Sequence, residues 1–507
     1  MTTRFTSAGW IGAAVVGFLV TSCSLIADVP APSQHDGAGE DGEADGAAEG
    51  DADVDGDGGT DDAAGDGCGE VVPRVPQPLS PENGAVTGSL LAPEHFNTLR
   101  PRFRWRWAED GCGSATFDIQ VDDSCATPGF ARCEMPSPER SATEIWTVEW
   151  HPDPGLSVST SAPVGRRFYW RVRACRAATC STWSPVRYVD VGRAPKDYDG
   201  DGYSDVAVGA DTQDAGAVDE GNAFVYYGGP SGIPSTPDVT LDNPTNQESA
   251  EFGGEIEWAG DLNADGFGDL VVGAFLYDSP AVNEGAAFVY YGSAAGIGTI
   301  PDMTLDNPDN LAGASFGSSA QRAGDVNGDG FVDLLVGNFE RDAGGDRGGK
   351  AFVYFGATTG IASLPNATLL NPTAQPAGFF GRVSSAGDVN GDGFADVMVG
   401  APYQDAGATD EGSAFLYYGS QTGLAPMPAV VLDDPTNQPE AHFGGSLAAA
   451  GDVDGDGYAD VIVGACGHSA GAAGEGNVFL YRGGETGIAG SPSMTLDNPA
   501  NQAGGEF

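Results

Sequence analysis

The stretch DVNGDGFAD at Asp388–Asp396 recurs with small changes in four other places, about 64 residues apart. The other copies occupy Asp197–Asp205, Asp261–Asp269, Asp325–Asp333 and Asp452–Asp460. Each copy has an oxygen-bearing side chain at its first, third, fifth and ninth positions and a glycine at its sixth. A repeat of this period indicates an array of similar structural units, so these acidic loops determine how the second half of the chain folds.

The residue types of the loops predict calcium binding. Ca²⁺ takes about six to eight hard oxygen ligands, and an acidic loop bent by glycine supplies them, with a backbone carbonyl at the seventh position. We therefore predict one structural Ca²⁺ in each loop. The candidate ligands are Asp197, Asp199, Asp201, Tyr203 and Asp205; Asp261, Asn263, Asp265, Phe267 and Asp269; Asp325, Asn327, Asp329, Phe331 and Asp333; Asp388, Asn390, Asp392, Phe394 and Asp396; and Asp452, Asp454, Asp456, Tyr458 and Asp460.

Other interpretations of the loops fit less well. An EF-hand needs Glu at position 12 and flanking helices, whereas position 12 is a valine in every copy: Val208, Val272, Val336, Val399 and Val463. A turn without metal would crowd carboxylates with no compensating charge. A further stretch, Asp53–Asp61, matches the loop pattern but no apolar strand follows it, so we do not expect a structured site there.

Four apolar segments accompany each loop. In the fourth unit they are Phe380-Gly381 before the loop, Val397–Ala401 directly after it, the aromatic stretch Phe415–Tyr418, and Val431-Leu432. Units of four short strands that are too small to fold alone are typical of β-propeller blades. We therefore expect an all-β fold with a propeller over residues 195–507.

The combination of these motifs resembles the FG-GAP repeat of integrin α-subunit propellers. The most complete copy joins Phe380-Gly381, the loop Asp388–Asp396 and Val399-Gly400-Ala401-Pro402, while the other copies change the last residues. The resemblance implies calcium in the acidic loops and favours seven blades, of which about five are encoded. The first unit lacks a Phe-Gly segment, and the sequence ends at Phe507, where the spacing predicts the next one. We therefore expect a truncated ring or one completed in another way.

Residues 68–194 have the alternation of a β-sandwich. Phe103 and Trp105, then Phe117, Ile119 and Val121, alternate with polar residues, as strands with one buried face do. The segment Phe168–Ala174 and the later Trp183-Ser184 resemble fibronectin type III domains. We expect Arg171 and Arg173 to stack on Trp183.

The cysteines of this region predict disulfides, because an even number in an exported protein is typical of them. The candidates are Cys68, Cys112, Cys125, Cys133, Cys175 and Cys180. Six cysteines allow about fifteen pairings. Short loops favour Cys125–Cys133 and Cys175–Cys180, which leaves Cys68 with Cys112. Cys466 is expected to be an unpaired, buried thiol.

The N-terminus has the features of an export signal. Arg4 precedes the apolar stretch Trp10–Val20, and Val20-Thr21-Ser22-Cys23 resembles the bacterial lipoprotein box. The resemblance implies that residues 1–22 are removed and that Cys23 carries a lipid, which would anchor the protein at a bacterial outer membrane or cell surface. An ordinary signal peptide is the alternative. Residues 23–67 are mostly Asp, Glu, Gly and Ala and are expected to form a disordered linker.

Charge and residue usage limit the functions to be considered. The formal net charge of −51 argues against nucleic acid as a partner. The five histidines form no recurring constellation, so we expect no enzyme but a surface protein for adhesion or recognition of a protein or glycan. The alternatives are a propeller-based polysaccharide-degrading enzyme and a lectin that binds sugar through Tyr226/Tyr227, Tyr290/Tyr291 and Tyr417/Tyr418. The expected contact loops are Asp211–Gly221, Tyr277–Gly285, Glu340–Gly349, Tyr403–Gly412 and Gly467–Gly476. The ligand and the oligomeric state stay open at this point.

Overall fold

The structure is a computed structural model that describes residues 71–91, 98–125, 133, 135, 137–338, 348–375 and 377–507. The predicted signal peptide, Cys23, the acidic linker, the stretch Asp53–Asp61 and Cys68 lie outside these residues. All regular elements in the described ranges are β-strands, which confirms the all-β prediction. Among them there is accordingly no helix that could cross a membrane.

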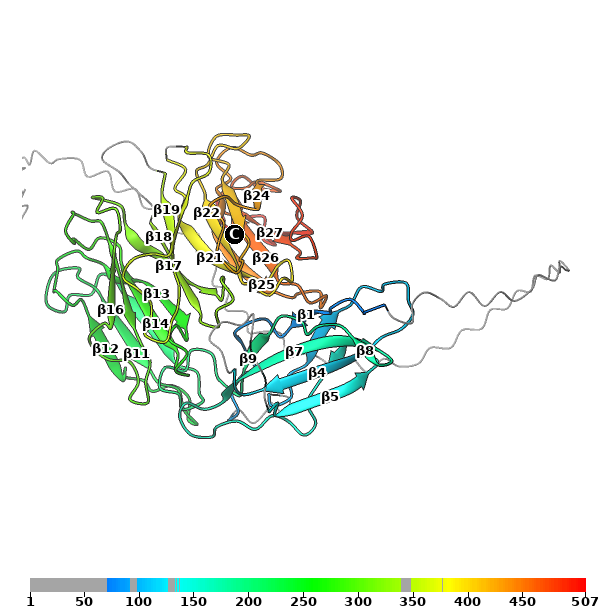
Figure 1. Cartoon of the computed structure of the whole chain (residues 1–507). Coiled ribbons are helices and arrows are strands. Elements are labelled where there is room, and N and C mark those ends of the chain that lie inside the picture. Colours follow the sequence, from blue (N-terminus) through cyan, green and yellow to red (C-terminus); the bar gives the residue numbers. More distant parts are fainter. Residues whose placement is uncertain are drawn as a thin grey trace, which may run out of the picture.

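The first described region forms a two-sheet β-sandwich, here called the sandwich domain (Figure 1). One sheet has the order β1-β3-β6 and the other the order β2-β9-β7-β4-β5, with β8 also paired to β7. The strands are β1 (Gln77–Ser80), β2 (Ala85–Val86), β3 (Phe103–Arg106), β4 (Thr116–Asp122), β5 (Arg140–Ile145), β6 (Glu149–Trp150), β7 (Arg166–Arg176), β8 (Thr179–Cys180) and β9 (Arg187–Val191).

The predicted alternation holds in the sandwich domain. The core contains Phe103, Trp105, Phe117, Ile119 and Val121, while the arginines between them on β3 stay at the surface. Outside the core, the guanidinium groups of Arg171 and Arg173 lie 4.8 and 4.6 Å from the centroid of the Trp183 ring. The predicted cation–π stack is therefore confirmed.

The disulfides agree with the prediction in part. Cys125–Cys133 and Cys175–Cys180 are bonded as expected. Cys112 and Cys466 are disulfide-bonded as well. The prediction of an unpaired thiol at Cys466 is therefore wrong, because the even number of cysteines between residues 68 and 180 gave no information about a cysteine outside that range. The pairing of Cys68 with Cys112 stays a prediction.

The remainder of the chain forms a series of antiparallel sheets, here called blades 1 to 5. Blade 1 has three strands in the described residues and each later blade has four, always paired in chain order. The strands are β10 (Val206–Ala210), β11 (Asn222–Tyr226) and β12 (Val239–Asp242); β13 (Phe252–Gly260), β14 (Asp269–Ala274), β15 (Ala286–Tyr290) and β16 (Met303–Asp306); β17 (Phe316–Gly324), β18 (Asp333–Asn338), β19 (Lys350–Tyr354) and β20 (Ala367–Leu370); β21 (Arg382–Gly387), β22 (Asp396–Ala401), β23 (Ser413–Tyr417) and β24 (Val430–Asp433); and β25 (Phe443–Gly451), β26 (Asp460–Ala465), β27 (Asn477–Tyr481) and β28 (Met494–Asp497).

The first strand of each of blades 2 to 5, here called the inner strand, packs against the preceding blade. The phenylalanine that opens the strand lies in a core shared by both blades, as Phe252 does with Val225 and Leu241. The backbone N–H of Phe252 donates to the Glu220 carbonyl at 2.9 Å, and Phe443 and Phe507 repeat this bond with Glu411 and Glu475. A core that spans two blades explains why a single unit cannot fold alone.

The Val-Gly glycine is needed for this packing. A Cβ on Gly273 or Gly400 would collide with the carbonyl oxygen of the Phe-Gly glycine of the next blade, Gly317 or Gly444. The two glycine motifs are thus the two halves of one blade-to-blade contact, which is why they recur together in the sequence.

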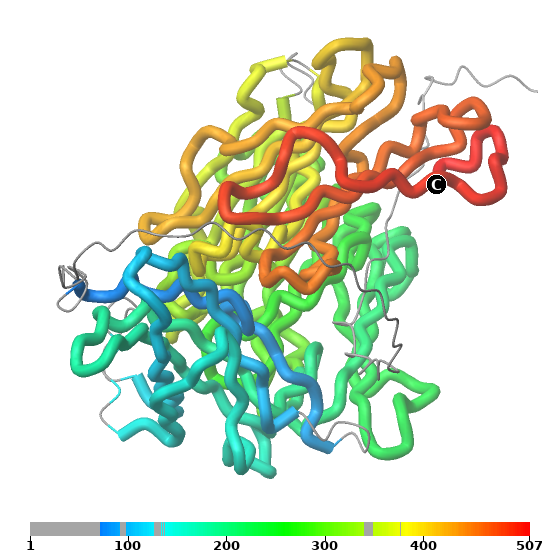
Figure 2. Tube along the Cα trace, turned by 90° about the vertical axis from the view of Figure 1, so that its right-hand side faces the viewer, coloured from blue at the N-terminus to red at the C-terminus, as the bar shows by residue number. Residues whose placement is uncertain are grey.

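The blades follow one another with their inner strands adjacent, β13 beside β17, β17 beside β21 and β21 beside β25. Figures 1 and 2 show the sandwich domain lying along one edge of this propeller-type array. In blades 2 to 5 the acidic loop joins the first and second strands at that same edge, and in blade 1 the acidic loop directly precedes β10. The fold therefore places the candidate metal sites against the sandwich domain.

An inner-strand glutamate gives a pH prediction. Burial raises the pKa of Glu255 to about 7, although its carboxylate accepts a hydrogen bond from the N–H of Ala320 at 3.1 Å. The folded state then holds this proton more tightly than the unfolded chain, so its contribution to stability is lost as pH rises from about 4.5 to 7. We expect Glu255→Gln to stabilise the chain at pH 8 by on the order of 1–2 kcal/mol and to have little effect at pH 4.5.

Denaturant unfolding at several pH values measures this effect. Glu440→Gln removes the same charge from an exposed position and serves as the control. An equal response of both variants at pH 8 would contradict the assignment.

Candidate metal centres

The acidic loops are closed by their own side chains. In the loop of blade 4, Asp388 Oδ2 accepts from the N–H of Gly393 at 2.9 Å, and Asn390 Oδ1 accepts from the N–H of Asp392 at 2.8 Å. Asp392 Oδ1 accepts from the N–H of Phe394 at 3.0 Å. The other four loops make the same contacts. The loop backbone thus directs the side chains of positions 1, 3 and 5 inward.

The ninth-position aspartate joins the loop to the rest of its blade. Asp396 is fully buried, and its two oxygens accept from the N–H groups of Val389 and Gly419, each at 2.9 Å. In every blade the second of these donors is the glycine that follows the third strand: Gly228, Gly292, Gly356, Gly419 or Gly483. This glycine was not among the predicted site residues, although its recurrence after the aromatic strand was a usable signal.

The loops have the features that a cation would satisfy. Carboxylate oxygens of Asp197, Asp199 and Asp205 lie within 4.8 Å of one another, as do those of Asp452, Asp454 and Asp460. Asp197 Oδ1 and Asp388 Oδ1 are buried and have no hydrogen-bond partner among the described residues. Burial raises the pKa of Asp197 and of Asp205 to about 7. Buried carboxylates without compensating charge are costly, and a divalent cation would remove that cost.

The donor set therefore fits calcium, which stays a prediction for all five loops. The side-chain oxygens of positions 1, 3, 5 and 9 would hold the ion together with the carbonyl of position 7. Bound calcium would supply positive charge and tie the inner strand to the second strand. The chain's own part is to hold these oxygens together before the ion arrives.

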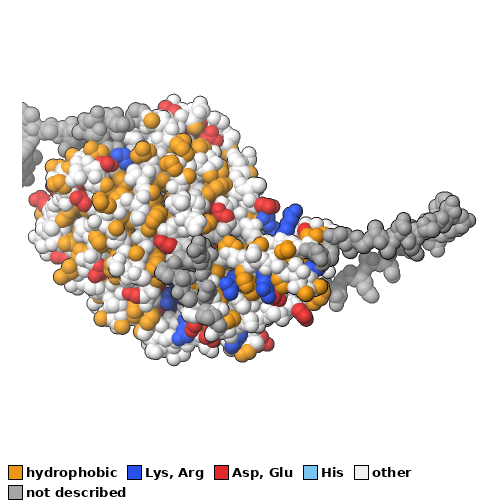
Figure 3. Space-filling view, in the orientation of Figure 1, with side chains coloured by type: hydrophobic (Ala, Val, Ile, Leu, Met, Phe, Trp, Pro, Cys, Tyr) orange, Lys and Arg blue, Asp and Glu red, His pale blue; other side chains and the backbone are white. Residues whose placement is uncertain are grey.

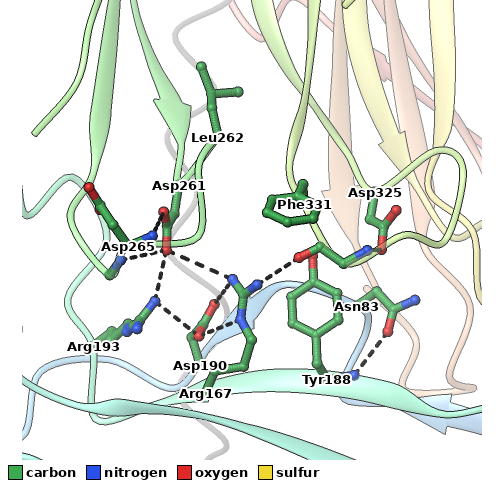
Figure 4. Close-up of polar contacts among 12 residues, drawn as sticks. Asn83, Arg167, Tyr188, Asp190, Arg193, Asp261, Leu262, Asp265, Asp325 and Phe331 are labelled. Atoms are coloured by element: carbon green, nitrogen blue, oxygen red, sulfur yellow. Dashed lines mark hydrogen bonds and ion pairs between the residues drawn. The ribbon is translucent and has the colours of Figure 1, made fainter. Parts of the chain in front are cut away.

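The sandwich domain inserts arginines among these loops. Arg187 is buried and donates to Asp388 Oδ2 at 2.8 Å and to the Leu79 carbonyl at 2.9 Å. Figure 4 shows the neighbouring cluster, in which Arg167 forms a bidentate pair with Asp190 and Arg193 reaches Asp261 at 3.1 Å. These contacts could not be predicted from the sequence, because nothing in a repeat pattern indicates which side chains of another domain lie against it.

The opposite edge of the blades is formed by the predicted contact loops. Four of them are pinned by a fully buried glutamate: Glu220, Glu284, Glu411 or Glu475. Glu411, for example, accepts from the N–H of Ala408 at 2.8 Å, and Glu475 accepts from that of Ala470 at 2.9 Å. The Glu-Gly pair that recurs before the third strand could have predicted these buried glutamates. Of the loop Glu340–Gly349, only the last two residues are described.

The tyrosines considered for sugar binding do not lie in these contact loops. Tyr290 and Tyr417 are fully buried in the blade cores. The Tyr227 and Tyr291 hydroxyls accept from the N–H groups of Ile297 and Ile361 in the next blade, at 2.7 and 2.9 Å. These tyrosines thus pack within and between blades.

The repeats have known counterparts. Residues 380–417 and 443–481 match the FG-GAP repeat family. These two matches lie in blades 4 and 5 and include the first three strands and the acidic loop of each, which confirms the family resemblance for that part of the chain.

Relatives with similar sequences are integrin α chains. Integrin alpha-PS3 of Drosophila melanogaster is 36% identical over 174 residues, which are 34% of this chain and 14% of that protein. Integrin alpha-IIb of Mus musculus is 38% identical over 162 residues, which are 31% of this chain and 15% of that protein. The chain therefore matches only about a seventh of the length of these curated relatives.

Among solved structures, the exotype rhamnogalacturonan lyase YesX aligns with 85% of this chain and 72% of its own chain, at 12% identity. Its TM-score is 0.29, so this likeness supports no conclusion about fold or function.

Proposed function

We propose that this protein is a non-enzymatic, calcium-binding recognition protein of the cell surface that binds a protein or glycan through its FG-GAP blades. The proposal is based on the difference between the two edges of the blades. One edge holds the acidic loops and is covered by the sandwich domain. The other exposes loops that differ in sequence and are held in shape by buried glutamates. A rigid scaffold with variable loops is suited to recognition.

The similarity to integrin α chains supports the same proposal. The acidic loops would then hold calcium as structural staples. The predicted signal peptide and lipid at Cys23 would anchor the protein at the surface of a bacterial cell, and the acidic linker and fibronectin-like sandwich domain would hold the blades away from it. Two of the three described histidines have packing roles, in keeping with a non-enzymatic protein: His442 packs on Tyr403, and His468 contacts Thr436 and Phe479.

Binding of the full chain to arrays of purified surface proteins and glycans tests the proposal, in millimolar calcium and in EDTA. We expect a ligand that is held in calcium and released in EDTA. The double variant Val218→Arg/Thr409→Arg changes two exposed residues of the free edge in blades 1 and 4 and should weaken binding at least tenfold.

The matched control is Thr236→Arg/Thr422→Arg, which changes two exposed residues at the sandwich-facing end of the same blades. Equal loss of binding in both double variants would contradict the assignment of the binding edge. Turnover of a polysaccharide by the full chain would overturn the non-enzymatic assignment.

A further inference from the structure

The sandwich domain contacts all five acidic loops. Ser89 donates to the Gly202 carbonyl in blade 1, Arg193 pairs with Asp261 in blade 2, and Arg167 donates to the Gly330 carbonyl in blade 3. Arg187 pairs with Asp388 in blade 4, and Arg104 donates to the Gly455 carbonyl in blade 5. The sandwich domain therefore spans the whole row of candidate metal sites.

The two surfaces have opposite charge. Fourteen of the 22 Lys and Arg residues lie between residues 68 and 194, whereas residues 195–507 hold 45 acidic and 7 basic residues. On the face in Figure 3, the Lys and Arg side chains gather over the sandwich domain, and the blades show few of them. The arginines of the sandwich domain thus bring positive charge to the acidic loops, to which blade 5 adds its own Arg482, paired with Asp454 at 3.1 Å.

Arginine contacts differ from loop to loop. In blades 2, 4 and 5 an arginine pairs with the first-position aspartate: Arg193 with Asp261 at 3.1 Å, Arg187 with Asp388 at 2.8 Å and Arg104 with Asp452 at 3.7 Å. Asp261 has a second arginine, Arg167, at 4.0 Å. In blades 1 and 3 the contacts given above go to backbone carbonyls instead.

The arginine and a calcium ion would share one carboxylate. Arg187 and the N–H of Gly393 both donate to Asp388 Oδ2, while Oδ1 of the same side chain is buried and has no hydrogen-bond partner in the described ranges. Arg187 thus leaves Oδ1 of Asp388 available to the ion. Its positive charge, however, lies on the other oxygen of the same carboxylate. Two cations on one carboxylate repel each other, and the repulsion is stronger where water is excluded.

We propose that the sandwich-domain arginines make the five calcium loops unequal, weakening calcium binding in blades 2, 4 and 5 relative to blades 1 and 3. The loop Asp197–Asp205, which has four aspartates and no arginine pair within the described part of the chain, binds most tightly. The loop Asp261–Asp269, with three aspartates and two arginines, binds most weakly. The inference rests on the calcium binding that is part of the proposed function.

The coupling is reciprocal by thermodynamic linkage. Calcium that enters an arginine-paired loop weakens the hold of that arginine by the same factor by which the arginine weakens calcium. The sandwich domain is therefore expected to be attached less firmly to the blades at high calcium concentration, with the change concentrated in blades 2, 4 and 5.

Arg104→Gln in the full chain is the decisive variant. Arg104 is partly exposed, so its replacement should leave the fold intact. The matched control is Arg102→Gln, two residues earlier, which makes the same charge change but pairs with Glu149 at 4.0 Å. Calorimetric titration with calcium should show one site tightened by about three- to tenfold in Arg104→Gln and none in Arg102→Gln.

A double variant tests whether the change in calcium affinity arises at the blade 5 loop. Asp456→Ala removes a predicted ligand of the blade 5 site, and in this background Arg104→Gln should no longer change calcium binding. Unchanged or weakened calcium affinity in Arg104→Gln, with binding by the unmodified chain intact, would overturn the inference and leave the proposed function standing. Absence of calcium binding by the unmodified chain would overturn both.

Discussion

Removing calcium from the full chain should lower its melting temperature by more than about 10 °C. Each acidic loop gathers buried carboxylates, and burial raises the pKa of Asp269, Asp333 and Asp396 well above the usual range. A site filled at about 100 times its dissociation constant adds about 2.7 kcal/mol to stability. Several such sites act on one array, because each inner strand is packed against two blades.

Scanning calorimetry in millimolar calcium, in EDTA and in magnesium measures this effect. Magnesium should restore little of the stability, since it requires closer octahedral geometry and keeps several of its waters. The same melting temperature in calcium and EDTA would remove the metal assignment from all five loops. The loops would then be Asp-Gly turns held only by their own hydrogen bonds.

Asp396→Ala should destabilise the chain by about 2–5 kcal/mol whether or not calcium is present. Its two oxygens are the acceptors for the buried N–H groups of Val389 and Gly419, which would be left without partners. Asp392→Ala in the same loop should behave differently. Asp392 accepts from the N–H of Phe394 and from Nδ2 of Asn390, each at 3.0 Å and at an exposed position of the loop, so both donors can turn to water. Its loss should therefore cost under about 1 kcal/mol in EDTA but remove much of the gain from calcium.

Denaturant unfolding of both variants in calcium and in EDTA separates the two roles. The two aspartates lie four residues apart in the same loop. Both variants therefore change the same blade, at a similar position relative to the sandwich domain. If Asp392→Ala destabilised the chain equally in both buffers, its carboxylate would be a structural acceptor and not a calcium ligand.

The repeat pattern in the sequence was enough to predict the strands of the blades. Four segments recur together because each blade packs against its neighbour in the same way. They are a Phe-Gly segment, an acidic loop, a Val-Gly strand and an aromatic strand. The glycine contacts between Gly273 and Gly317 show why the two glycine motifs cannot vary independently. The alternation of Phe103 and Trp105 with arginines likewise predicted a buried face in the sandwich domain.

The candidate ligands were also readable from the sequence, because positions 1, 3 and 5 are neighbours along the chain and a glycine turn brings them together. The carbonyl of position 7 follows from the same turn. Local spacing alone thus identified these oxygens, and the structure adds the backbone donors that hold them.

Only the tertiary structure decided what lies against the loops. Arg187 is 201 residues from Asp388, and no periodicity relates the sandwich domain to the blades. The disulfide bond of Cys466 was also missed, because the cysteine pattern of the sandwich domain gave no information about it. Sequence therefore determined the repeat and its loop chemistry, which are set by neighbouring residues. The structure determined the charge around each loop, because electrostatic energy depends on distance in space and not on separation along the chain.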